Sequence, residues 1–259
     1  MKTEFILPMI LAAVLLFDLI RSAQILRSGR HVLVVAFFAF ATACNLFSTL
    51  YWIAYDFLRQ DARMPFAANE ICEWALFLLL ASSLRAAFVQ GLPLKKMAFP
   101  AFLFAAANAA LWIAWSGEWV EDILTGISLG WYFCVLTACL LESDTLRKTE
   151  WIGIAAVAFL LIAAQSATFF APDSAQGAIS FLCTVLVFAV EGWLMLKTFL
   201  ALRKNEYPKQ GLSLSFAAYA WSTVAMYMND GWIYNAALFL ASVCYLMMLL
   251  AIVKEVAAE

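Results

Sequence analysis

Charged residues and histidine are scarce in this chain. Asp, Glu, Lys and Arg make up 13% of its 259 residues, about half the share that is typical of a water-soluble domain. Hydrophobic residues make up 66%, and the mean hydropathy is +0.88. A surface that faces water on all sides cannot be built from this composition. A formal net charge of −2 provides no basic surface for a nucleic acid either, so we expect no nucleic-acid partner.

The residues of most catalytic and metal sites are also missing. His31 is the only histidine, which argues against a bis-histidine haem, an HExxH zinc site and a Ser-His-Asp triad. The six cysteines lie in apolar runs without C-x-x-C spacing, as buried small hydrophobic residues do. Glycine-rich phosphate loops and the G-x-S-x-G motif are absent. We therefore expect no catalytic residue, no metal and no cofactor, which favours a protein that is not an enzyme.

Long apolar blocks separated by short links dominate the sequence. A helix of about twenty apolar residues crosses the hydrocarbon core of a bilayer, and the chain has room for eight or nine such helices. We predict an all-α, polytopic transmembrane bundle that forms a single integral membrane domain over residues 1–259. Nine spans are expected, or eight if the short eighth block does not cross. The predicted spans are Phe5–Ile20, Val32–Leu58, Pro65–Val89, Met97–Trp115, Trp119–Leu141, Trp151–Ala171, Gly177–Leu202, Leu212–Met228 and Gly231–Val253.

The lysines and arginines are concentrated in every second link. Because Lys and Arg are retained on the cytoplasmic side during insertion, their distribution predicts an outer N-terminus and a cytoplasmic C-terminus. Compact links without an N-x-[ST] glycosylation site favour a bacterial cytoplasmic membrane. Lys2, Arg59 and Arg63 lie on the predicted outer side, and the other cations lie on the inner side: Arg21, Arg27, Arg30, Arg85, Lys95, Lys96, Arg147, Lys148, Lys197, Arg203, Lys204, Lys209 and Lys254.

Acidic and aromatic residues gather where the second span leads into the third, on the predicted outer side. A carboxylate attracts a cation, and aromatic faces replace part of the hydration that the cation loses. The alternative is that Trp and Tyr form the ordinary interfacial belt and that the acids complement helix N-termini. The predicted ligand-binding residues in this region are Trp52, Tyr55, Asp56, Asn69, Glu70, Glu73 and Trp74.

Glu70 and Glu73 are the strongest candidates in this group. Counted from Pro65, they lie about 8 and 12 Å along the third span and share one helix face. Two carboxylates this close should differ in proton affinity, with one protonated near neutral pH unless a cation lies between them. In the alternative interpretation, both are solvated in a vestibule or bridged by Arg59 or Arg63.

Glu191 is the eighth predicted ligand-binding residue. It lies about 21 Å from Gly177 along the seventh span, where a carboxylate costs about 2.5 kcal/mol or more, so it must face protein or water. It is either an inner acidic station on a solute path or a structural carboxyl that is neutral or paired, with Lys197 less than two turns away. Asp18 is expected at the membrane interface.

Uncharged polar residues lie deep in other predicted spans. Asn45, Asn108 and Gln165 are expected mainly to hydrogen-bond between helices. As a set, they could also extend a polar path inward from the outer vestibule.

The leading functional hypothesis is binding or transport of a small cationic or proton-coupled solute through an outward-facing acidic and aromatic cavity. The first alternative is a membrane sensor or accessory subunit that acts through a partner membrane protein or as a homo-oligomer. An intramembrane hydrolase that uses Glu70 with Glu73, or Asp56 with Glu73, as acid and base is less favoured, because no nucleophile accompanies them. A purely structural role would need no polar interior. In every case the lipid bilayer is an expected partner.

Overall fold

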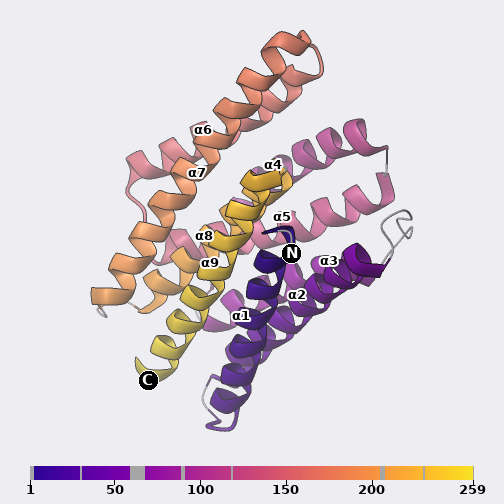
Figure 1. Cartoon of the computed structure of the whole chain (residues 1–259). Coiled ribbons are helices and arrows are strands. Elements are labelled where there is room, and N and C mark those ends of the chain that lie inside the picture. The colour runs from indigo at the N-terminus through magenta and orange to yellow at the C-terminus, as the bar shows by residue number, and fades with distance from the viewer. Residues whose placement is uncertain are drawn as a thin grey trace.

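The computed structural model describes residues 3–29, 31–58, 68–88, 91–117, 119–204, 208–229 and 231–258. Within these ranges the chain forms nine helices and no strand, packed as an elongated bundle (Figure 1). The predicted all-α membrane bundle is therefore confirmed. The helices are α1 (Thr3–Leu26), α2 (Val32–Leu58), α3 (Ala68–Ala87), α4 (Leu94–Ser116), α5 (Trp119–Glu142), α6 (Lys148–Thr168), α7 (Asp173–Lys204), α8 (Pro208–Tyr227) and α9 (Gly231–Ala258).

Seven of these nine helices in the described chain are long and apolar enough to cross a membrane. The exceptions are α3 and α8. Each has 20 residues, or about 30 Å of helix, which is the thickness of the hydrocarbon core. Their composition separates them from the rest: α3 carries Glu70, Glu73 and Arg85, and α8 carries several serines and a threonine. Both are long enough to span, but too polar to face lipid along their whole length.

Several helices extend beyond the apolar runs that predicted them. The first helix continues past Ile20 to Leu26, α7 begins at Asp173 instead of Gly177, and α9 continues past Val253 to Ala258. The sequence boundaries were drawn where charged or turn residues interrupt the apolar pattern. Polar helical turns are stable beyond the hydrocarbon, where water and headgroups solvate them, so hydropathy ends earlier than the helix does.

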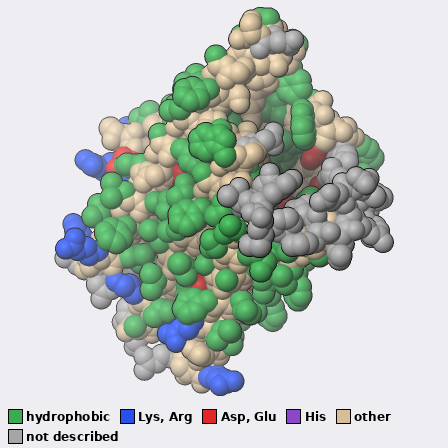
Figure 2. Space-filling view, viewed as in Figure 1, with side chains coloured by type: hydrophobic (Ala, Val, Ile, Leu, Met, Phe, Trp, Pro, Cys, Tyr) green, Lys and Arg blue, Asp and Glu red, His purple; other side chains and the backbone are tan. Residues whose placement is uncertain are grey.

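The Lys and Arg side chains gather toward one end of the bundle. Figure 2 shows them on the left and lower parts of the molecule, where the C-terminus lies in Figure 1. Acidic side chains appear both among them and in a recess on the right of the same view. This distribution is the one on which the predicted orientation is based, whereas the orientation itself stays a prediction. Arg59 and Arg63 lie outside the described residues.

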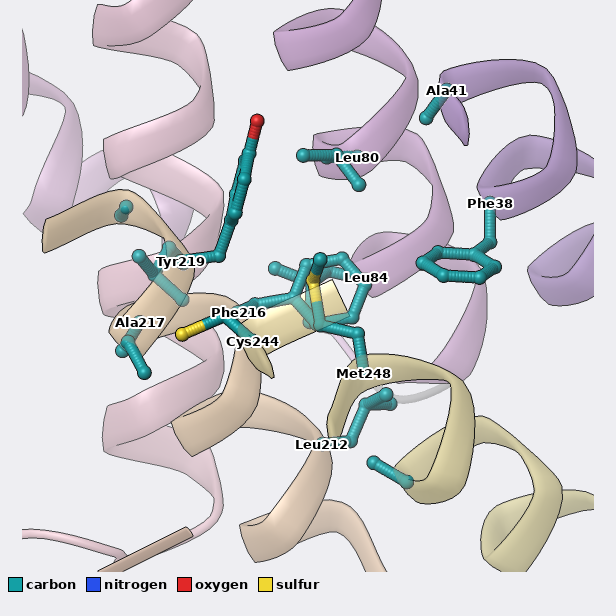
Figure 3. Packing of buried hydrophobic residues seen from close by; sticks show 14 of the residues in the cluster. Phe38, Ala41, Leu80, Leu84, Leu212, Phe216, Ala217, Tyr219, Cys244 and Met248 are labelled. Carbon is teal, nitrogen blue, oxygen red and sulfur yellow. The ribbon is translucent and has the colours of Figure 1, made fainter. Parts of the chain in front are cut away.

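The core is centred on α8. Every residue from 211 to 220 is buried, and α8 packs against α9, α7, α5 and α3. Figure 3 shows Phe216 of α8 among Phe38 of α2, Leu84 of α3 and Met248 of α9, with the Tyr219 hydroxyl directed away from Met248 on the Leu80 side of the cluster. Because α2, α3, α8 and α9 all contribute to this cluster, polar groups on their inward faces are held away from lipid.

Helices α4 and α5 form a closely packed hairpin that borders the core. A Cβ atom at Gly130 would lie 2.7 Å from the ring of Phe102, which is closer than side chains pack. Gly130 therefore allows α4 to approach α5 at the depth of Phe102. The α6–α7 hairpin lies further out and diverges from α4 and α5 at its far end (Figure 1). Its helix α6 has Leu161 as its single buried residue.

Candidate functional site

Glu73 of α3 lies at a junction of three helices. Its Oε1 accepts a hydrogen bond from the Ser48 hydroxyl of α2 at 3.2 Å, and its Oε2 accepts one from the Tyr227 hydroxyl of α8 at 2.9 Å. Trp52 of α2 also hydrogen-bonds to the carboxylate. We call this group of Glu73, Ser48, Trp52 and Tyr227 the Glu73 junction. A carboxylate that receives several side-chain donors is held in a defined position.

Glu70 and Asn69 occupy the first turn of α3, beside the Glu73 junction. Both are buried, at 5% and 4% exposure, and Glu70 interacts electrostatically with Glu73. The Oδ1 atom of Asn69 has no hydrogen-bond partner among the described residues. Counted from Ala68, where the described helix begins, Glu70 and Glu73 lie about 3 and 8 Å along α3. The two acids are thus neighbours near one end of the bundle, and the region around residues 65–67 lies outside the description.

An aromatic group on α2 borders the Glu73 junction. The rings of Tyr51 and Tyr55 stack with centroids 6.2 Å apart, and Trp52 meets Tyr55 edge-on at 5.8 Å. Trp52 therefore contacts both the aromatic group and the Glu73 carboxylate. The side chain of Asp56 lies outside the described part of the structure, so the pairing of Asp56 with Glu73 stays a prediction.

Trp74 extends to a different neighbour from that of Glu73. Its indole N–H donates to the Thr125 hydroxyl of α5 at 2.8 Å. This bond ties α3 to α5, while Glu73 ties α3 to α2 and α8. Sequence adjacency placed Trp74 and Glu73 together, but successive helix residues point about 100° apart. The Trp74 indole N–H is thus directed at α5, and its predicted part in ligand binding stays a prediction.

Glu191 lies in a second, separate group of buried polar residues. It is fully buried on α7, and its Oε1 accepts a hydrogen bond from Ser222 of α8. The Ser222 oxygen lies 3.5 Å from the Cys244 sulfur of α9, so three helices meet here. The Oε2 atom of Glu191 has no hydrogen-bond partner in the described chain. We call Glu191, Ser222 and Cys244 the Glu191 site.

Lys197 does not pair with Glu191. Its Nζ lies 2.9 and 2.8 Å from the two carboxylate oxygens of Glu150 on α6, and it also donates to the Thr145 carbonyl oxygen. Because α7 begins at Asp173, Glu191 is about 27 Å from that end, deeper than the sequence boundary implied. The interpretation that Lys197 neutralises Glu191 is therefore wrong, and a hydroxyl takes that place.

Helix α8 lies between the two carboxylate groups. Ser222 and Tyr227 are five residues apart, or about 140° around the helix axis. Between them, Thr223 and Tyr219 continue the polar surface, and the amide of Asn45 on α2 lies 3.5 Å from the Tyr219 hydroxyl. The predicted interhelical role of Asn45 agrees with this contact. Glu73 and Glu191 thus do not meet in one group, although a single helix touches both.

A cavity adjoins the Glu73 junction. Asn108, Gln165 and Thr223 provide polar groups on its wall. Asn108 donates to the Phe104 carbonyl oxygen of its own helix at 2.9 Å instead of to another helix. We call this space the aromatic cavity, because its other walls include Phe77, Phe104, Trp112, Tyr132, Phe133 and Tyr227.

One further carboxylate is buried where the sequence predicted an interfacial position. Asp18 of α1 and Ser22, one turn later, are both fully buried, and neither side chain has a hydrogen-bond partner in the described residues. Neighbouring helices cover them because α1 packs against α2 and α9. Hydropathy could not foresee this, since it ranks a residue by its own chemistry and not by what packs over it.

Sequence reasoning missed Ser48, Ser222, Cys244 and Tyr227 as members of these groups. Serine and cysteine are common in membrane helices, and Tyr227 had the appearance of an interfacial aromatic residue. The available signal was the polarity of α8, whose Ser213, Ser215, Ser222 and Thr223 are unusual for a membrane span. A helix too polar for lipid must be enclosed by protein, so its hydroxyl groups must face other helices.

Comparisons of the chain with protein-family models, with curated proteins and with solved structures found no match. Within the described residues, no group of three or more His, Cys, Asp or Glu side chains is placed to hold a metal ion. The function of these groups therefore has to be inferred from their own chemistry.

Proposed function

We propose that this multi-pass membrane protein binds or transports a small cation at the Glu73 junction, alone or coupled to a proton. The observation that carries the proposal is the Glu73 carboxylate, held by Ser48 and Tyr227 from two other helices. Such a group is costly within a membrane. The position of the Glu73 carboxylate at a junction of three helices is explained if a ligand binds to its negative charge.

The surrounding residues fit a cation better than an anion or a neutral solute. Glu70 adds a second acid close to Glu73, and Trp52 and Tyr227 bring aromatic rings to the same carboxylate. The ring of Trp112 lies 5.5 Å from that of Tyr227. A cation that loses part of its hydration here would gain both a carboxylate and π faces, whereas an anion would be repelled by Glu70 and Glu73.

In the transport version of this proposal, the Glu191 site is the second station. Glu191 lies deep on α7, and its second carboxylate oxygen has no partner among the described residues. A solute or proton that leaves Glu73 would pass α8, which carries both Tyr227 and Ser222. Transfer between the stations would require α8 to shift or rotate, because the two residues point about 140° apart.

Binding of radiolabelled methylammonium to the purified protein in nanodiscs tests the proposal. We expect saturable binding that falls about tenfold or more in Glu73→Gln, because the ion–carboxylate attraction is lost. Glu142→Gln is the matched control, since Glu142 is an exposed acid at the other end of the bundle and its loss should leave binding unchanged. Wild-type binding by Glu73→Gln would contradict the proposal.

Flux measurements separate the remaining alternatives. Uptake of methylammonium into proteoliposomes that vanishes in both Glu73→Gln and Glu191→Gln supports transport. Binding without uptake favours a sensor or accessory subunit that signals through a partner. Turnover of a lipid or peptide bond, lost in Glu73→Gln, would instead favour an acid–base enzyme.

The outward direction of the site depends on the orientation predicted from charge, as does residence in a bacterial cytoplasmic membrane. Single reporter tags inserted beside Lys95 and beside Glu118 test it in intact cells. We expect the tag at Glu118 to react with an impermeant reagent and the tag at Lys95 to stay protected. The same response at both positions would contradict the orientation.

A further inference from the structure

The aromatic cavity and the Glu73 junction share one residue. Tyr227 lines the cavity with its ring and donates its hydroxyl to Glu73 Oε2. Trp112, another cavity residue, packs against the Tyr227 ring with centroids 5.5 Å apart. A ligand whose charged group lies at Glu73 would therefore have the cavity next to the remainder of its structure.

The walls of the cavity fit an apolar or aromatic group. Rings of Phe77, Phe104, Phe133 and Tyr132 come from α3, α4 and α5, and aromatic rings pack favourably edge-on or offset against another ring. Phe104 and Phe133 already do so with each other at 5.5 Å and an interplanar angle of 73°. None of these four side chains offers a charge to a ligand, so the part of the ligand that enters here must be uncharged.

Gln165 adds a hydrogen-bonding group to this apolar wall. Its side-chain amide makes no hydrogen bond to the rest of the described chain, although an amide can make four. It is carried by α6, which is apolar over residues 151–164 and has only Leu161 buried. A ligand that enters the cavity can therefore exchange a hydrogen bond with Gln165, which lies on its wall.

The cavity must widen to accept such a ligand. The space that the centre of a water molecule can reach is about 20 Å³, enough for about one water. Helix α6 is the wall best able to move, because it packs mainly on α7 and touches α4 only slightly.

We propose that the aromatic cavity binds the uncharged aromatic body of an amphipathic organic cation whose ammonium group lies at the Glu73 junction. This inference rests on the proposed function and narrows its substrate class from any small cation to a protonated arylalkylamine. The ammonium group meets Glu73 and Tyr227, the ring lies among Phe104, Phe133 and Trp112, and any hydrogen-bonding substituent meets Gln165.

Three probes that carry one or both parts of the proposed ligand distinguish the two parts of the site. Methylammonium carries the charge alone, 2-phenylethanol carries the aromatic body alone, and 2-phenylethylammonium carries both. Binding of each is measured by equilibrium dialysis against the protein in nanodiscs, with empty nanodiscs subtracted. We expect 2-phenylethylammonium to bind about tenfold or more tighter than methylammonium, because its ring leaves water for the cavity.

Gln165→Trp is the variant that tests the cavity, because its larger ring would occupy the space. Ala163→Trp places the same ring two residues away on α6, at an exposed position, and serves as the control. Gln165→Trp should reduce 2-phenylethylammonium affinity to that of methylammonium, while methylammonium binding and the Ala163→Trp variant stay unchanged. Gln165→Leu has nearly the same side-chain volume and serves as a control for misfolding. It should still bind the ring of 2-phenylethylammonium, but its affinity for probes that carry a hydrogen-bonding substituent should fall.

The failures of the two proposals are distinguishable. If Glu73→Gln abolishes binding of both ammonium probes while Gln165→Trp binds 2-phenylethylammonium like the wild type, the cavity inference is overturned and the proposed function stands. If Glu73→Gln changes neither ammonium probe, the proposed function is overturned. Equal affinities of wild-type protein for methylammonium and 2-phenylethylammonium would also overturn the cavity inference.

Discussion

Helices α8 and α6 are nearly equal in length and differ in almost everything else. Helix α8 is buried without a break from residue 211 to 220, yet it is not among the seven helices apolar enough to be candidate spans. Helix α6 is among the seven, although only Leu161 is buried. Hydropathy therefore does not measure burial, because it passes over the buried helix α8 and selects the exposed helix α6. Two groups that reach the buried carboxylates, Ser222 and Tyr227, lie on the helix that it passes over.

The two helices also use their hydroxyl groups differently. Ser222 of α8 donates to Glu191 of another helix, whereas Ser166 of α6 donates to the Ile162 carbonyl oxygen of its own helix. Tyr227 of α8 likewise reaches Glu73 on α3. Ser222 and Tyr227 thus connect α8 to other helices, whereas the Ser166 bond stays within α6. Substitutions of the same kind should therefore have unequal effects in the two places.

The largest expected difference is in packing. Phe216→Ala should lower the free energy of unfolding by about 2–3 kcal/mol, because it leaves a cavity in the core. The hydrophobic part of this cost is small, because lipid tails are as apolar as the lost contacts. Phe159→Ala should cost about 0.5 kcal/mol or less, because its side chain is 71% exposed. Titration with SDS followed by circular dichroism measures both. Equal costs would mean that α8 is not the centre of the core.

Loss of a buried hydroxyl should have the next largest effect. Ser222→Ala should cost about 1–2 kcal/mol, because the fully buried Glu191 carboxyl loses its hydrogen bond. The matched change Ser166→Ala should stay within about 0.5 kcal/mol, since it removes only a bond to the same helix. The same SDS titration is the measurement, and a neutral Ser222→Ala would show that Glu191 does not depend on α8.

Coupling across α3 and α8 should be smaller but specific. A double-mutant cycle of Glu73→Gln and Tyr227→Phe should give an interaction energy of about 1 kcal/mol, because the two side chains share a hydrogen bond. A cycle of Glu73→Gln with Thr125→Ala serves as the control and should give almost none, since Thr125 bonds Trp74 instead. Additive effects in the first cycle would remove Tyr227 from the Glu73 junction.

The smallest effect is expected at the ion pair that joins α6 to α7. Lys197→Met removes the contact with Glu150, whose side chain is 13% exposed while that of Lys197 is 25% exposed. We expect a loss of about 1 kcal/mol or less at low salt, shrinking as salt screens the pair. Unfolding at low and high salt measures it, with Lys148→Met, an exposed cation of α6, as the reference. Lys197 Nζ also lies 4.9 Å from the centroid of the Trp193 ring, so a cost that is independent of salt would indicate lost packing on that ring.

The sequence was sufficient to predict the helices but insufficient to predict which helices pack against one another. Apolar runs between charged links identified all nine helices, and the cost of a carboxylate in lipid correctly singled out Glu191 as a residue that must face protein. For Asp18 the sequence predicted a position at the membrane interface, which stays a prediction, and its full burial was not foreseen. Which helix covers a residue depends on tertiary packing, and no pattern within one span carries that information.

The composition of the candidate site was foreseen only in part. Glu73 and Trp52 do lie together, because α2 and α3 are consecutive helices that pack against each other. Tyr227 comes from 154 residues further along the chain, and nothing in its local sequence distinguishes it from an interfacial tyrosine. Contacts across that separation follow from how α8 inserts between α3, α5, α7 and α9, and this arrangement has no local signature.

The most direct test of the account is whether the Glu73 carboxylate itself meets the ligand. Infrared difference spectroscopy of the reconstituted protein, with methylammonium chloride exchanged for sodium chloride at equal ionic strength, reports changes in carboxylate vibrations. We predict a carboxylate difference band in the wild type and in Glu142→Gln that is absent from Glu73→Gln. A band that persists unchanged in Glu73→Gln would contradict the central claim.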